Sequence, residues 1–457
     1  MHAPPPTPTP SRTGIKAVAA VLFVAGLGVA LAVPVLGSSD SSPPATERRR
    51  PRPHRTRTVP PSTPAPSPEE ASPTPSASPS PSVAANRVVT PYPEHCLEPL
   101  PPPSGTGLVA AFDGTQVAIA DPDGGTVATF RVVPPIQWSP SGDVLATGGG
   151  DLWTTAGERD GRLFAHERGQ WAWSPVANCA LQASEEGIYA SSIHGPDKLL
   201  TSIGALDLSI SPDGTRVAFV HGDDSGASSL LFVNLRKGTI REGLPPIEEA
   251  AILLQGWAPD GATALYSLDG EVAGADTLLG VAMGRGPQPL SGEDLVPETG
   301  AVDRCGSQLI GAVGAHRAHG DNHLALLTAG EPPDYLTADG YVYGSPSCSA
   351  DGVYAVAVRG GRGGGRRLVL VQPNDGTETV LTQGDYNDMY AEWADGTTAV
   401  LFVRKRKGSA PEVWTLESSS ARGIDVTLDP AVAYYGSPGW NAILDWSATA
   451  PTGAPAG

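Results

Sequence analysis

Short apolar runs recur along the C-terminal part of the chain, and each follows a polar turn of nearly the same sequence. The clearest copy is ISPDGTRVAFV, residues 210–220. Ser-Pro-Asp-Gly is typical of a tight turn, because Pro fixes φ at the second position and Gly readily closes the turn. The apolar run that follows predicts a β-strand. Four further copies are WSPSGDVLATG, WAPDGATALYS, CSADGVYAVAV and WADGTTAVLFV, beginning at Trp138, Trp257, Cys348 and Trp393.

Each copy predicts a unit of four strands. Strand A precedes the turn and strand B follows it, and stretches such as LLFVNL and ETVLT then supply strands C and D. The two longest gaps between copies each hold one degenerate unit, WAWSPVANCALQAS from Trp171 and RCGSQLIGAVG from Arg304. The spacing of the resulting seven units is typical of β-propeller blades, which repeat about every 40–50 residues.

An eighth blade is assembled from the two ends of the repeat region. Residues 108–130 resemble strands B, C and D without a strand A, and NAILDW at 441–446 can supply the missing strand. Such closure removes exposed sheet edges. The sequence therefore predicts an all-β propeller over residues 104–447, with eight blades favoured and seven as the alternative. IEEAAILLQ, from Ile247, has a helix-like pattern, and we interpret it as a D–A loop leading into strand A.

The Trp-Ser-Pro-Asp-Gly turn followed by VAFV resembles the TolB-like and WD-repeat-like β-propeller repeats. The resemblance covers residues 108 to about 446 and implies a propeller fold and often an exported, protein-binding role. It supplies no catalytic residues to transfer to this chain.

The N-terminal region predicts an anchored or exported protein. A tail, residues 1–14, precedes an apolar run over 15–36 that is long enough to span a bilayer. We favour a retained anchor, with a cleaved signal peptide as the alternative. Residues 37–103 form a Pro/Ser/Thr-rich linker that predicts disorder, and 448–457 form a second disordered tail. Six arginines between 48 and 57 argue for a cytoplasmic propeller, but we favour the extracytoplasmic placement that a Pro-rich stalk indicates.

Charge separates the two halves of the chain. Residues 1–103 hold nine basic and six acidic residues, and the remainder holds 21 basic and 42 acidic residues. The acidic excess of residues 104–457 argues against nucleic-acid binding. The four cysteines permit two disulfides, and their blade positions favour the pairs Cys305–Cys348 and Cys96–Cys179. The alternative is that some of them are small buried residues with free thiols.

The known catalytic motifs are absent from the sequence. There is no Gly-x-Ser-x-Gly elbow and no phosphate-binding glycine loop followed by Lys. We therefore expect a protein that is not an enzyme and needs no cofactor. One histidine cluster, AHRAHGDNH, could wrap a metal ion through His316, His319 and His323, and a polar loop is the alternative interpretation.

Two basic runs fall between strands B and C of consecutive blades. In a propeller all B–C loops emerge on one face, so we predict that these runs form one sector that docks an anionic partner. The predicted patch comprises Arg359, Arg362, Arg366, Arg367, Arg404, Lys405, Arg406 and Lys407.

These observations favour a membrane-tethered extracytoplasmic propeller that acts as a protein-binding scaffold in the cell envelope. The expected partner is an envelope protein or another anionic envelope component. An enzyme with its site in the propeller channel, of the lyase or glycan-processing type, is one alternative. A sensor of a ligand or metal ion is the other.

Overall fold

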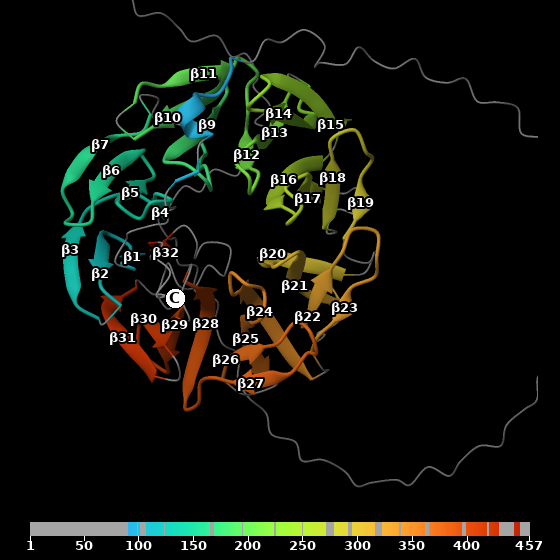
Figure 1. Cartoon of the computed structure of the whole chain (residues 1–457). Helices are drawn as coiled ribbons and strands as arrows, with labels where there is room; N and C mark the ends of the chain where they lie inside the picture. The colour runs from blue at the N-terminus through green and yellow to red at the C-terminus, as the bar shows by residue number, and fades with distance from the viewer. Residues whose placement is uncertain are drawn as a thin grey trace, which may run out of the picture. The chain divides into compact units, whose positions relative to one another are not determined.

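Eight four-stranded antiparallel sheets are arranged around a central axis in the computed structural model of the chain (Figure 1). The structure describes residues 90–447 apart from these positions: 98, 101–106, 123, 165–168, 194, 224, 249, 271–277, 291–294, 316–321, 338–339, 362–364, 395–398, 418–419 and 429–442. The predicted anchor at 15–36 and most of the predicted linker lie outside the described residues.

Each blade is named here by its strands. The bounds are β1 (Val109–Phe112), β2 (Val117–Ala120), β3 (Thr126–Phe130); β4 (Ile136–Trp138), β5 (Val144–Thr147), β6 (Asp151–Thr154), β7 (Arg159–Arg162); β8 (Trp171–Trp173), β9 (Cys179–Ser184), β10 (Gly187–Ser192), β11 (Lys198–Thr201); β12 (Asp207–Ile210), β13 (Arg216–Gly222), β14 (Ser228–Asn234), β15 (Thr239–Ile247); β16 (Ala250–Trp257), β17 (Thr263–Gly270), β18 (Leu279–Ala282), β19 (Gln288–Pro289); β20 (Leu295–Cys305), β21 (Gln308–Ala315), β22 (Asn322–Leu327), β23 (Asp334–Tyr335); β24 (Tyr341–Cys348), β25 (Ala355–Gly361), β26 (Arg367–Val371), β27 (Glu378–Val380); β28 (Tyr386–Trp393), β29 (Ala399–Arg406), β30 (Pro411–Glu417), β31 (Ser420–Thr427); and β32 (Leu444–Trp446).

The eighth blade joins segments from opposite ends of the repeat region. Strand β32 pairs antiparallel with β1, in the register Val109–Trp446 and Ala111–Leu444. Strands β2 and β3 complete the sheet in the order β3-β2-β1-β32. The prediction of eight blades, with the last one closed by the residues near 441–446, is confirmed.

The repeated turn forms as its sequence predicts. In the turn after β12, the Gly214 N–H donates to the Ser211 carbonyl at 2.8 Å, and Gly214 has a φ of +65°. The Asp213 carboxylate accepts from the Ser211 hydroxyl at 2.6 Å and from the Thr215 N–H at 3.1 Å. Left-handed backbone at this position favours glycine, which explains why the glycine recurs from blade to blade.

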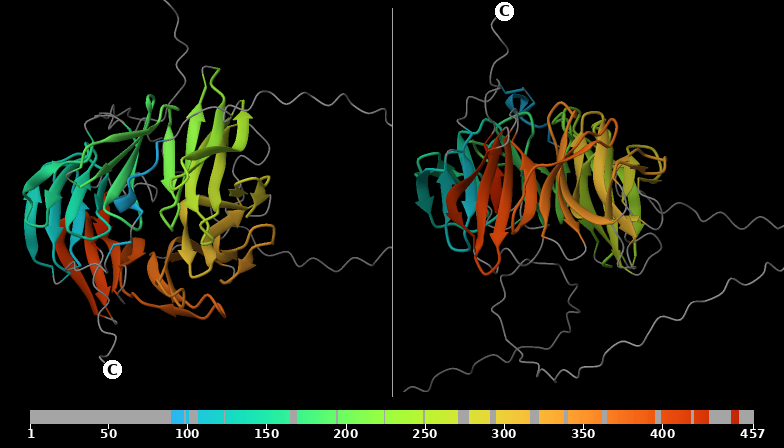
Figure 2. Two further views of the ribbon diagram at one scale, coloured as in Figure 1. Left: turned by 45° about the horizontal axis from the view of Figure 1, so that its top comes forward. Right: turned by 90° about the horizontal axis from the view of Figure 1, so that it is seen from below.

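Strands B and C of each blade form the core. Strands β13 and β14 are almost entirely buried, because neighbouring blades cover both of their faces. The outer strand β3, in contrast, is largely exposed. Figure 2 shows the blades stacked side by side around the ring, so most of the apolar surface is buried between adjacent blades.

The interpretation of IEEAAILLQ as a loop is wrong. Strand β15 continues to Ile247 and β16 begins at Ala250, so most of this stretch belongs to strands. The first positions of β16 alternate between buried and less buried. That two-residue period is the one a strand requires, and the helix-like spacing of the apolar residues concealed it.

The last part of the predicted linker packs on the propeller. Around a short 3-10 helix, η1 (Glu94–Cys96), the Thr90 and Tyr92 N–H groups donate to the carbonyls of Leu200 and Leu235. Tyr92 and Cys96 are buried in the core between blades β8–β11 and β12–β15. Packed residues are thus found as early as residue 90, within the predicted linker over 37–103. Among the described residues, no helix is both long and apolar enough to cross a membrane.

Candidate functional site

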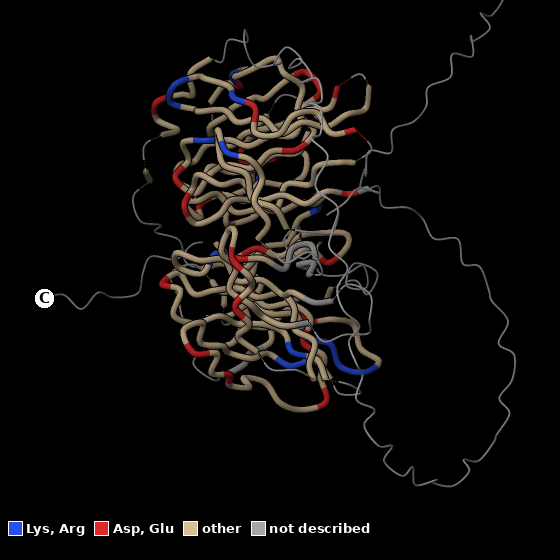
Figure 3. The backbone as a smooth tube through the Cα atoms, turned by 90° about the vertical axis from the view of Figure 1, so that its right-hand side faces the viewer, with Lys and Arg blue, Asp and Glu red and all other residues tan. Residues whose placement is uncertain are grey.

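Two charged regions, on opposite faces of the propeller, are candidates for function. The first is the predicted basic sector, at the B–C connections after β25 and after β29. In an antiparallel blade the A–B and C–D turns lie at one end, and the B–C and D–A connections lie at the other. Figure 3 shows a group of basic segments in the lower right part of the backbone, and further basic segments nearer its top.

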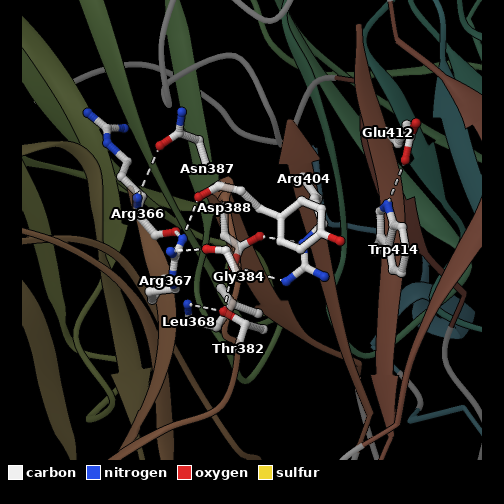
Figure 4. A network of polar contacts seen from close by, with 11 residues as sticks. Arg366, Arg367, Leu368, Thr382, Gly384, Asn387, Asp388, Arg404, Glu412 and Trp414 are labelled. Carbon is white, nitrogen blue, oxygen red and sulfur yellow. Dashed lines mark hydrogen bonds and ion pairs between the residues drawn. The ribbon is translucent and has the colours of Figure 1, made fainter. Parts of the chain in front are cut away.

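Arg404 does not belong to an exposed patch. Its side chain is only 7% exposed, and its Nε donates to Oδ1 of the fully buried Asp388 at 2.8 Å. A second bond joins Nη2 to Oδ2 at 3.2 Å (Figure 4). The guanidinium also lies 4.5 Å from the centre of the Tyr386 ring and 5.0 Å from that of Trp414. The prediction of partner contact is wrong here, because β29 turns this side chain into the blade and a buried cation needs a paired carboxylate.

Two further arginines of the predicted patch have contacts within the propeller. Arg367 donates to the backbone carbonyls of Gly384 and Tyr386 and so joins blade β24–β27 to blade β28–β31 (Figure 4). Arg359 forms an ion pair with Glu378 and stacks over Tyr341 at 4.4 Å. Both guanidinium groups therefore have structural partners. Arg362 lies outside the described residues.

The other four cations lie at or beside the B–C connections of two adjacent blades, and we call them the basic ridge: Arg366, Lys405, Arg406 and Lys407. Lys405 is half-buried and the other three are exposed. The Arg366 N–H donates to Asn387 Oδ1 at 3.1 Å, and Asn387 is paired with Lys405 across β28 and β29. This contact brings the two basic runs together. Arg406 lies 5.3 Å from the centre of the Tyr386 ring, so an aromatic side chain separates the ridge from the buried Arg404.

The predicted histidine cluster is only partly within the described residues. His316 and His319 lie outside them, whereas the His323 ring contacts Tyr335, and its Nδ1 is 3.2 Å from the Thr337 carbonyl. Within the described part of the chain, one group of ligand-type side chains converges to within 4.8 Å, namely His95, Cys96 and Cys179. Its two cysteines form a disulfide, so their sulfur atoms are not free to bind a metal ion.

The second charged region is a pocket that the sequence analysis did not predict. It has a volume of about 410 Å³ and lies beside the A–B turns, between strands β20, β24 and β28. Its charged lining residues are Asp303, Arg304 and Glu392, and Tyr390 and Trp393 are its aromatic ones.

The sequence does contain a signal for this pocket. Strand A ends on Trp in five blades and on Ile210 in a sixth, but β20 and β24 end on Cys305 and Cys348. These cysteines form a disulfide between the two blades, with the Cα atoms 5.2 Å apart. A disulfide is much smaller than two indole rings, so space remains where other blades are filled. Strand β24 also bulges beside the pocket, where Ser345 has a φ of +48°.

Burial shapes the electrostatics of the pocket. Asp303 accepts hydrogen bonds from the N–H groups of Arg304 at 2.7 Å and Cys348 at 2.9 Å, yet burial raises the pKa of its carboxyl group. The Tyr390 hydroxyl donates to Glu392 Oε2 at 2.8 Å. Burial, followed by the nearby carboxylates of Glu392, Asp445 and Asp303, raises the pKa of Tyr390 well above its usual value. Two acidic side chains, Asp303 and Glu392, and one basic side chain, Arg304, line the pocket.

Both predicted disulfides are present in the structure. Cys96–Cys179 attaches the segment that begins at residue 90 to the propeller, and Cys305–Cys348 joins two blades.

Comparison with known proteins finds solved structures that contain a similar fold. No family profile and no curated protein matches the sequence. Dipeptidyl peptidase 4 from Porphyromonas gingivalis is 13% identical, with a TM-score of 0.51 over 77% of this chain and 60% of that one. TolB from Acinetobacter baumannii is 14% identical, with a TM-score of 0.36 over 75% of this chain and 67% of that one. The protein has a β-propeller fold. A puromycin-hydrolyzing peptidase from Mycobacterium tuberculosis is 13% identical, with a TM-score of 0.43 over 74% of this chain and 56% of that one.

These comparisons correct one expectation. The absence of catalytic motifs favours a protein that is not an enzyme, but dipeptidyl peptidase 4, an enzyme, is among the solved structures similar to this propeller. Propellers of this kind thus occur in enzymes, and the expectation of no enzymatic activity is withdrawn. The chain spans about 60% of the length of the dipeptidyl peptidase, and at such low identity the likeness shows the fold alone.

Proposed function

We propose that this propeller is a binding module that captures an acidic protein partner through the basic ridge. The observation that carries the proposal is the meeting of two basic runs, from different blades, in this ridge. The ridge lies on a propeller with a strong acidic excess, so it is the natural contact for an anionic surface. The contacts of Arg367 and Arg404 hold the two blades and their strands in place beneath it.

The proposal includes an extracytoplasmic location in the cell envelope. Two disulfides support it, because such bonds persist in oxidising compartments. The apolar run at 15–36 would tether the propeller to the membrane, and the following Pro-rich segment would act as a spacer. The propeller fold is consistent with a scaffold of this kind.

The test begins with crosslinking in intact cells, followed by enrichment of the protein and identification of what is attached to it. Envelope proteins with acidic surfaces are the expected result, whereas recovery of cytoplasmic proteins would contradict the location. A captured partner then allows a direct test of the ridge by measuring association rates at several salt concentrations.

The test variant is Arg406→Ser/Lys407→Ser, and the matched control is Arg236→Ser/Lys237→Ser. The control pair is equally exposed but lies at a C–D turn, on the opposite face. We expect the ridge variant to slow association by about threefold or more at low salt and to weaken its salt dependence. Equal effects of the two pairs would show that net charge alone matters, and the ridge would then not be the docking site.

A further inference from the structure

We propose that the pocket between β20, β24 and β28 binds an organic cation, through an alkylammonium or guanidinium group. This inference goes beyond the proposed function, because the pocket opens among the A–B turns and shares no residue with the basic ridge. The propeller would then have two binding surfaces of opposite charge on its two faces.

The shape of the pocket favours a small ligand or a single side chain. Four blades contribute to it, and its volume of about 410 Å³ is in the range of small-molecule sites. Its walls are set by the disulfide of Cys348 on one side and by Trp393 on another. The cavity therefore does not depend on the conformation of one loop.

The charges of the lining favour a cation. Among the lining residues Asp303 and Glu392 are acidic, and Arg304, the one basic residue, is exposed. The Asp303 residue is half-buried, and two backbone N–H groups donate to its carboxylate. Glu392 holds the Tyr390 hydroxyl, which lies in the field of two other carboxylates. An ammonium or guanidinium group would compensate this charge where solvent is partly excluded.

Two observations favour an organic cation over a metal ion. The pocket contains the aromatic rings of Trp393 and Tyr390, and such rings attract organic cations through their faces. Asp303 and Glu392 also do not belong to the one described group of ligand-type side chains that converges within 4.8 Å. A metal ion needs several converging oxygen atoms. An organic cation can instead contact carboxylates that lie apart, together with an aromatic ring.

The test uses titration calorimetry at low salt on the propeller as it exists, with both disulfides intact. The probes are n-butylammonium and N-propylguanidinium chloride, and n-butanol is the matched uncharged probe. Capped tripeptides with a central Lys or Arg distinguish the two sources of the same chemistry. Tighter binding of a tripeptide than of the free cation would indicate a protein side chain as the occupant, and the reverse would indicate a free small molecule.

Three variants decide the outcome. Glu392→Gln removes one charge and should weaken binding of both cations by about tenfold or more. Ala350→Phe changes no charge but fills the exposed rim, and should abolish binding. Glu417→Gln, at an exposed position outside the pocket, is the control and should bind like the wild type. Thermal unfolding of each variant checks that it is folded. If Glu392→Gln does not fold, Ala350→Phe still tests the proposal.

Equal binding of butanol and butylammonium would overturn the proposal. So would a lack of measurable cation binding, or binding that both Glu392→Gln and Ala350→Phe leave unchanged. The variant Arg406→Ser/Lys407→Ser should bind the cations normally, so a failure of the ridge proposal and a failure of the pocket proposal can be told apart.

Discussion

The basic ridge and the acidic pocket differ in how their charges are distributed along the chain. The ridge comes from dense basic runs, yet its neighbours Arg404 and Arg367 have their guanidinium groups bound inside the propeller. The acidic residues of the pocket are Asp303 on β20 and Glu392 on β28, and no stretch of sequence looks acidic there. Local charge density therefore overestimates one binding surface and misses the other, because burial and strand direction decide which charges reach the solvent.

The largest effect on stability is expected from Arg404→Ser, which removes the buried cation of the second basic run. It would leave the fully buried Asp388 without its cation, so we expect a loss of about 3–5 kcal/mol in the free energy of unfolding. Lys407→Ser, three positions beyond the end of the buried run, should change the free energy of unfolding by less than about 0.5 kcal/mol. Urea denaturation measures both. Similar values for the two variants would mean that Arg404 is not held as the structure shows.

The next effect concerns the disulfide beside the pocket. Cys305→Ala/Cys348→Ala removes a bond that closes a sequence separation of 43 residues, and should cost about 2–4 kcal/mol. The cation probes should also bind more weakly, because this bond forms one wall of the pocket.

Cys96→Ala/Cys179→Ala is the matched control for the weaker binding of the cation probes. It removes a bond of separation 83 and should cost a similar free energy, but it leaves the pocket intact. Limited proteolysis should then cut the segment around residue 90. Loss of cation binding in this variant as well would mean that the probes report general stability.

The smallest effect concerns the half-buried Asp207, which is not among the lining residues of the pocket between β20, β24 and β28. Burial raises the pKa of Asp207 to about 6, although the Leu254 N–H of the next blade donates to its carboxylate. In the unfolded chain the group ionises near pH 4, so its ionisation opposes folding, and stability is lost as the pH rises from about 4 to 6. Asp207→Asn should thus stabilise the protein by about 1–3 kcal/mol at pH 7 and have little effect below pH 4.

The check is the pH dependence of unfolding for the wild type and for Asp207→Asn. The two curves should converge in acid and separate through the window between pH 4 and 6. A constant difference at every pH would show that the amide, and not the lost ionisation, causes the change.

The fold could be predicted because each blade repeats the same local chemistry. The Asp213–Gly214 turn and the buried strand after it need no distant information, and the missing strand of the eighth blade follows from counting. The site could be predicted only in part. The ridge follows from the rule that B–C loops share a face, but the burial of Arg404 depends on Asp388 of the neighbouring strand. The pocket depends on which residue replaces Trp at the end of each strand A, and this can be recognised only once the blades are aligned in space.

The pairing of β32 with β1 has a consequence for synthesis of the protein. Strand β1 is made early, but its partner Leu444–Trp446 is added only after all seven other blades. Until then the edge of β1 has unpaired N–H and C=O groups, and the ring is open. A nascent or truncated chain therefore has an open ring of blades, and the unpaired edge of β1 can form hydrogen bonds with a strand of another chain. The topology therefore requires that this edge be protected until strand β32 has been synthesised and has paired with β1.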